Sequence, residues 1–218
     1  MKGLLIKDFK LILLQKNFLI ITLIVALGVV LFNNNLIFPL GFASFIASLL
    51  AISTINYDEL DNGYTFLFTL PITRKKYIFE KYLLGLLTGG SVWGIITILV
   101  IIINILKSTL VFFDLISSSL MMLSLMFIIQ AIMFPFQIKF GSEAGRIAML
   151  GAFGILTILF WGLVKVIKLI FDINLITLLN NLQTLDLKIF LTILIISSLL
   201  SLLISLNISL TIINNKEF

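Results

Sequence analysis

The side chains that could carry chemistry are few and lie mostly in one short polar stretch. The chain has no histidine and no cysteine, which excludes the commonest metal ligand and general base, disulfide bonds and cysteine-ligated metals. Acids and bases gather between Tyr57 and Lys81, where Asp58, Glu59 and Asp61 precede the basic run Arg74-Lys75-Lys76. This stretch is therefore the most informative part of the sequence.

Known intramembrane enzymes need residues that this chain lacks. A zinc protease requires His-Glu-x-x-His and a rhomboid-like protease a Ser–His pair, so the absence of histidine excludes both. Aspartyl catalysis needs paired aspartates within the membrane, but every aspartate falls in a predicted loop or interface. A phosphate-binding loop needs a lysine after its glycines, and the glycine-rich stretch Gly85–Ser91 has none. We expect no catalytic residue, no metal and no cofactor on this chain.

The composition predicts an all-α integral membrane protein. Of 218 residues, 61% are hydrophobic and 11% are charged, with a mean hydropathy of +1.23. Ordinary soluble domains are about 45–50% apolar and about 25% charged. No water-soluble interior could hide so much apolar surface, so we expect a single transmembrane domain over residues 1–218.

Charge-free runs predict six membrane-spanning helices, because a span needs about 20 mostly apolar residues. The first run, from Asn17 to Tyr57, holds 41 residues and is interrupted by the turn-favouring cluster Asn33-Asn34-Asn35, so it is divided into two spans. The predicted spans are 17–32, 36–55, 82–106, 115–138, 147–164 and 189–213.

The basic residues predict the orientation, because lysine and arginine are retained on the cytoplasmic side. With the N-terminus inside, eleven of the fifteen basic residues are cytoplasmic. We therefore expect a multi-pass protein of the bacterial plasma membrane with both termini on the cytoplasmic side. Basic loops against anionic lipid account for the net charge of +5, and nothing supports nucleic-acid binding. The four basic residues expected outside are Lys107, Lys165, Lys168 and Lys188.

The first residues have the pattern of an interfacial helix. One helical face carries apolar side chains and the opposite face carries charges, as in a helix lying flat at the inner membrane surface. The alternative is a continuation of the first span, with Lys16 reaching to the interface. The apolar face holds Leu5, Phe9, Ile12 and Leu13, and the charged face holds Lys7, Asp8 and Lys10.

The polar stretch after the second span predicts a short cytoplasmic helix of about 12 residues, roughly 18 Å long, from Asp58 to Leu70. Its acids suit a helix N-terminus, and Leu60, Tyr64 and Leu67 share one face. Pro71 ends this helix, and Thr73 caps the next one. The cations at 74–76 anchor to anionic headgroups or form an ordinary solvated loop.

Small residues in the third and sixth spans predict close helix packing. Gly85 and Gly89 allow another helix to approach, and Ser197, Ser201 and Ser205 recur every four residues, either packing helices or lining a pathway. Pro135 predicts a kink in the fourth span. Leucines between Lys165 and Lys188 predict short extracellular helices.

The polar stretch resembles the cytoplasmic loop of ABC-2 type transporter permeases, the membrane subunits of one class of ATP-driven exporter. The whole layout is similar, but the motif resemblance covers only Tyr57 to Tyr82. The matching residues are Asp58-Glu59, Asn62-Gly63, Leu70-Pro71-Ile72, Arg74-Lys75, Tyr77 and Lys81-Tyr82.

The resemblance implies that the segment from Asp58 to Leu70 is a coupling helix that docks on a separate ATPase subunit, which holds ATP and magnesium. It also implies a second permease, identical or different, and membrane lipids as surroundings. One subfamily exports amphipathic peptides such as phenol-soluble modulins and antimicrobial peptides, so a peptide or lipid-like substrate is expected. The implied coupling residues are Asp58, Glu59, Leu60, Asn62, Gly63, Tyr64, Leu67, Leu70, Pro71, Arg74 and Tyr77.

Two other classes of function remain open. A stand-alone carrier usually places an ionisable residue within a span, and none of the six predicted spans holds one. A non-transporting immunity or assembly protein is also compatible with the sequence, because a fold alone does not define a function.

The predicted orientation can be tested by cysteine labelling, because the chain has no cysteine of its own. Asn62→Cys and Lys75→Cys should react with an impermeant thiol reagent only after the cytoplasmic side is opened. Labelling of either position from the exterior of intact cells would invert the topology.

Overall fold

The computed structural model describes the backbone of residues 2–33, 36–60, 63–107, 110–171 and 187–216, and the side chains of these residues except 31, 33 and 142–171. Throughout these ranges the regular structure is helical. The helices are α1 (Lys2–Leu14), α2 (Lys16–Asn33), α3 (Ile37–Glu59), α4 (Gly63–Thr69), α5 (Arg74–Lys107), α6 (Phe112–Phe171) and α8 (Leu187–Asn215).

Among the described residues, four helices are long and apolar enough to cross a membrane: α3, α5, the first part of α6 (Phe112–Gly141) and α8. A fifth is added if the bent pair α1–α2 counts as one span. The structure thus shows an all-helical membrane protein with four or five candidate spans, and six spans stay a prediction. The predicted span 147–164 falls in the second part of α6, and the predicted extracellular helices fall largely in 172–186, outside the described residues.

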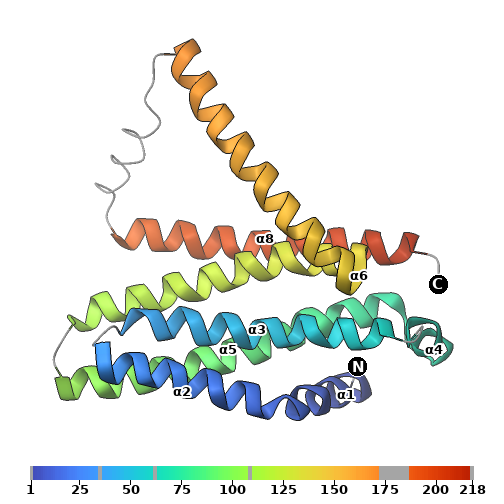
Figure 1. The fold of residues 1–218 in the computed structure, drawn as a ribbon, viewed down its shortest axis with the longest axis horizontal. Helices are drawn as coiled ribbons and strands as arrows, with labels where there is room; N and C mark the ends of the chain where they lie inside the picture. Colours follow the sequence, from blue (N-terminus) through green and yellow to red (C-terminus); the bar gives the residue numbers. More distant parts are fainter. Residues whose placement is uncertain (1, 34–35, 61–62, 108–109, 172–186, 217–218) are drawn as a thin grey trace.

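The long helices, with α6 only as far as Gly141, lie side by side, with α3 at the centre between α2, α5 and α6, while α8 packs against α6 and α5 (Figure 1). Beyond Gly141 α6 runs at a steep angle away from them. The start of α1, the helix α4 and the end of α8 all lie at one end of the bundle, which we call the α4 end. The 34 residues of α5 measure about 51 Å, longer than the hydrocarbon core of about 30 Å. Part of α5 therefore extends beyond the hydrocarbon.

The first helix, α1, is bent from α2 by 63°, and its position at the membrane interface stays a prediction. Its buried face includes residues of both predicted faces. Leu4, Asp8 and Ile12 point into the bundle, whereas Phe9 and Leu13 are exposed. The prediction of Asp8 on the outer polar face was wrong, because Asp8 has cationic partners inside the bundle.

The predicted close approach of helices occurs at Gly85 and Gly89 of α5. A Cβ at Gly85 would lie 2.9 Å from the ring of Phe134 in α6, and a Cβ at Gly89 would lie 3.2 Å from Cβ of Ser48 in α3. At Gly90 a Cβ would meet nothing within 4 Å. Gly85 and Gly89 therefore serve helix packing.

A serine of α8 supplies the hydrogen bond that a proline removes from α6. Pro135 has no N–H, which leaves the carbonyl of Ala131 without its helical donor. The Ser205 hydroxyl donates to that carbonyl, and the Tyr82 and Ser209 hydroxyls continue the chain of hydrogen bonds. Ser201 bonds within α8, as does Ser197, which is exposed. Of the predicted serines, only Ser205 joins two helices.

The break in α6 lies at Gly141, six residues beyond Pro135, and the predicted kink at Pro135 itself stays a prediction. Gly141 has φ 77° and ψ −169°, a backbone conformation that residues with a Cβ rarely adopt. The Glu59 carboxylate at the end of α3 also occupies the space where a Cβ would stand. Both conformation and space therefore require glycine here.

Two alanine substitutions test the packing of α5. Gly85→Ala should lower the melting temperature of the purified protein, because overpacking against a buried ring costs about 1–3 kcal/mol. Gly90→Ala should be neutral or stabilising, because open space leaves only the helix-propensity gain of about 0.5–1 kcal/mol. Equal melting temperatures for the two variants would contradict this packing.

Candidate functional site

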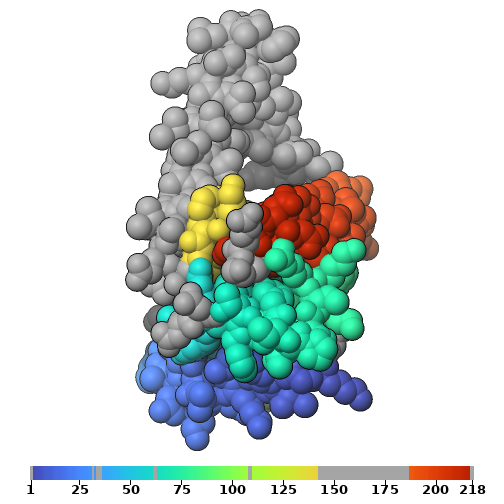
Figure 2. All heavy atoms as spheres, turned by 90° about the vertical axis from the view of Figure 1, so that its right-hand side faces the viewer, coloured from blue at the N-terminus to red at the C-terminus, as the bar shows by residue number. Residues whose placement is uncertain are grey.

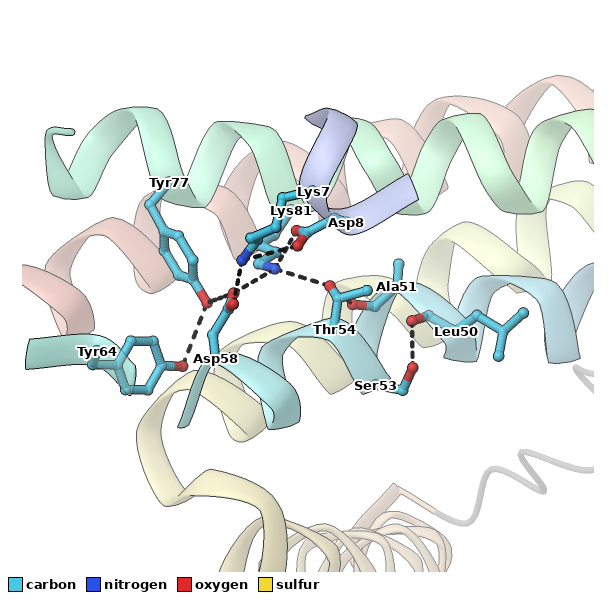
Figure 3. A network of polar contacts seen from close by, with 10 residues as sticks. All are labelled: Lys7, Asp8, Leu50, Ala51, Ser53, Thr54, Asp58, Tyr64, Tyr77 and Lys81. Carbon is cyan, nitrogen blue, oxygen red and sulfur yellow. Dashed lines mark hydrogen bonds and ion pairs between the residues drawn. The ribbon is translucent and has the colours of Figure 1, made fainter. Parts of the chain in front are cut away.

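Four charged side chains from three helices meet at the α4 end and form what we call the ionic cluster: Lys7 and Asp8 of α1, Asp58 of α3 and Lys81 of α5 (Figure 3). The Lys81 ammonium lies 2.7 Å from Asp58 and also pairs with Asp8. Lys7 lies 3.0 Å from Asp8 and also pairs with Asp58. Each lysine thus bridges both aspartates.

The ionic cluster is inside the protein. The side chains of Asp8 and Lys81 are 0% exposed and that of Asp58 is 6% exposed, whereas Lys7 is 34% exposed. The hydroxyl of Thr54 accepts a further hydrogen bond from Lys81, at 2.9 Å. Removing such charges from water costs several kcal/mol per ion, which only their mutual pairing and added hydrogen bonds offset. The ions therefore hold α1, α3 and α5 in one arrangement.

Two tyrosines connect the ionic cluster to α4. The Tyr77 hydroxyl donates to Asp58 at 3.2 Å and lies 3.5 Å from the Tyr64 hydroxyl (Figure 3). The rings of Tyr64, Phe68 and Tyr77 also pack together, with centroids 5.9–6.2 Å apart. Burial raises the pKa of Tyr64, which therefore stays neutral. This short helix is bound to the interior by both polar and aromatic contacts.

The end of α8 completes the attachment of α4. The Arg74 guanidinium donates to the carbonyls of Ile213 and Asn214 at 3.0 and 2.8 Å, where a helix C-terminus carries partial negative charge. Arg74 also lies over the ring of Phe68, and Lys216 lies over the ring of Tyr64. Movement of α4 would therefore disturb α8 as well.

The predicted start of the short helix was wrong. Asp58 and Glu59 are the last residues of α3, followed by Leu60 in an extended conformation, and α4 covers only the seven residues Gly63–Thr69. Asp58 continues α3 because it binds the two lysines rather than helical N–H groups. The predicted end before Pro71 agrees with α4, and the Thr73 hydroxyl caps α5 by accepting from the Lys76 amide at 3.3 Å. Asn62 lies outside the described residues.

The predicted docking face is turned inward. Tyr64 and Leu67 are only 5% and 7% exposed and belong to the apolar core, whereas Leu60 is exposed. An amphipathic pattern shows which side of a helix avoids water. That side can pack against the core of the same chain as well as against a partner protein. The outward residues of α4 and its flank are Thr65, Phe66, Thr69, Leu70 and Pro71.

Sequence reasoning did not identify Lys7, Asp8 and Lys81 as site residues. A signal was present: Leu4, Asp8 and Ile12 repeat at helical spacing, and Lys81 lies next to the third span. Burying an ionisable residue in or beside an apolar helix costs free energy, and such residues are often functional.

Among the described residues, no group of three or more metal-ligating side chains is present.

Comparison with protein families identifies the class. A model of the ABC-2 family transporter protein matches residues 3–214, nearly the whole chain. The chain belongs to this family of transporter permeases and is a multi-pass cell-membrane protein. Comparisons with curated proteins and with solved structures find no match.

Lys81→Met should destabilise the protein strongly, because it leaves the buried carboxylates of Asp8 and Asp58 short of a cation at a cost of about 3–5 kcal/mol. Thermal unfolding in detergent measures the loss. Lys75→Met is the matched control, because Lys75 is exposed and changes at such positions usually stay within about 0.5 kcal/mol. A Lys81 variant as stable as the control would show that the ion pairs do not hold the helices together.

Proposed function

We propose that this chain is the permease subunit of an ATP-driven exporter and that α4, with its flank through Pro71, receives movement from a separate ATPase subunit. Membership of the ABC-2 family supports the transporter class. The lack of a phosphate-binding loop supports ATP hydrolysis on another polypeptide. The observation that carries the proposal is the attachment of α4 to the ionic cluster, which gives a surface helix a path into the bundle.

The outward side of α4 is suited to a protein partner. Figure 2 looks onto the α4 end, where the residues around α4, in blue-green, form the surface between α1 in blue and the end of α8 in red. Phe66 is 71% exposed at the centre of this short helix, and Leu70 is 44% exposed. A large aromatic side chain at a protein surface is a typical anchor of a binding interface.

A displacement of α4 would reach the interior of the bundle because the buried side of α4 is bound to it. ATP binding would close the partner and displace α4, and Tyr64 and Tyr77 would transmit the displacement to Asp58. Since Asp58 is bound to lysines of α1 and α5, these helices would move together. The permease would thereby shift between inward-closed and open populations.

A second permease, identical or different, would complete the pathway, and the substrate would be an amphipathic or hydrophobic molecule, with a peptide favoured. An open, almost entirely apolar hollow of about 300 Å³ between α3 and α6 supports this substrate class. The hollow is lined by Phe38, Gly41, Phe42, Phe45, Met122, Leu125, Met126 and Ile129.

The alternatives are a non-transporting immunity or assembly protein and a stand-alone carrier. Neither needs an ATPase, so the neighbouring genes discriminate among them. An adjacent ATPase gene with a phosphate-binding loop supports the exporter, and its absence favours an alternative.

Phe66→Asp should weaken co-purification with the ATPase at least about tenfold, because an aromatic anchor contributes about 2 kcal/mol or more. The variant should still insert and fold, since Phe66 is exposed. Phe112→Asp is the matched control, as an exposed phenylalanine at the start of α6. Unchanged co-purification of the Phe66 variant would remove α4 as the contact.

A further inference from the structure

A fifth charged residue lies beside the ionic cluster without taking part in its ion pairs. Glu80 precedes Lys81 in α5, and its side chain is 0% exposed. Among the described residues, neither of its carboxyl oxygens has a hydrogen-bond partner. A buried polar group without a partner usually costs several kcal/mol and therefore needs an explanation.

The cations that face Glu80 are already paired with other acids. From α1 they are Asp8 and Lys7, and from α5 its neighbour Lys81. Both lysines are bound to Asp8 and to Asp58 of α3, and Asp58 also accepts from Tyr77. With three carboxylates against two ammonium groups, the fully ionised set carries a net charge of −1. A buried set of this kind is balanced when one carboxyl is protonated.

A second oxygen without a hydrogen bond belongs to the acid that faces Glu80. Oδ1 of Asp8 has its contact with Lys7 at 3.0 Å but no hydrogen-bond partner. A protonated carboxyl is a donor as well as an acceptor. One proton placed between these two acids would therefore satisfy an oxygen of each and remove the excess charge.

We propose that the junction of α1 and α5 is a proton-binding site, in which Glu80 carries the proton and shares it with Asp8 while α1 is docked. When α1 lifts away, the Glu80 O–H bond breaks, the proton passes to water and the carboxylate becomes hydrated. Docking of α1 is thus linked to uptake of one proton. The site does not depend on the ATPase contact, and it can be tested on the purified permease alone.

The sign of the pH dependence follows from this linkage. A glutamate in an unfolded chain loses its proton above about pH 4.3, whereas the docked state keeps it. Because the folded state then binds more protons, stability falls as the pH rises. A bound metal ion would give a different explanation, but the described residues hold no group that could ligate one.

Glu80→Gln keeps the size of the side chain and permanently supplies a neutral donor. In detergent, the melting temperature of the wild type should fall by at least about 3 °C between mildly acidic and mildly alkaline buffer. The Glu80→Gln profile should be flatter and lie above the wild type in alkali. Asp114→Asn, which changes an exposed acid at the start of α6, should follow the wild type. Parallel profiles for wild type and Glu80→Gln, or a Glu80→Gln protein that fails to fold, would overturn the proposal.

A labelling measurement reports on α1 itself. Ile12→Cys places a thiol on the buried face of α1, and Phe9→Cys places one on the exposed face. Dividing the labelling rate of Ile12→Cys by that of Phe9→Cys cancels the pH dependence of thiol reactivity. This ratio should rise severalfold in alkali with Glu80 present and stay constant with Glu80→Gln. A constant ratio in both backgrounds would show that no proton is linked to docking of α1.

Discussion

Buried ion pairs between two lysines and two aspartates constrain the whole α4 end of this protein. The pairs lie inside an apolar bundle, where the free-energy cost of burying an isolated charge is far larger than the stabilisation from one hydrogen bond. The three buried side chains, Asp8, Asp58 and Lys81, therefore cannot be buried without their partners. Because they come from α1, α3 and α5, the positions of these helices are interdependent, and the tyrosines extend this dependence to α4.

The sequence predicted the class of fold well because lipid imposes a simple requirement on composition. Long charge-free runs identified helices of spanning length, and Pro71 and Thr73 identified the boundary between α4 and α5. The ionic cluster could not be predicted in the same way. Two of its four pairs join residues 51 and 73 positions apart, and such pairings depend on how helices pack rather than on local pattern.

The inward side of α4 shows a second limit of sequence reasoning. Tyr64 and Leu67 have the spacing of a docking face, but a helical pattern does not distinguish an external groove from the protein's own core. Burial of both side chains leaves Phe66 as the large apolar residue facing outward. The family resemblance predicts a role for this segment, and the three-dimensional arrangement shows which of its sides is buried.

Gly141 connects this end of the bundle to the part of the chain that follows. It occupies a conformation available mainly to an achiral residue, and the Glu59 carboxylate at the end of α3 fills the space beside it. The chain therefore changes direction at a residue that contacts the last turn of α3. A displacement of the last turn of α3 would therefore act directly on Gly141, so the direction of the second part of α6 depends on where α3 ends.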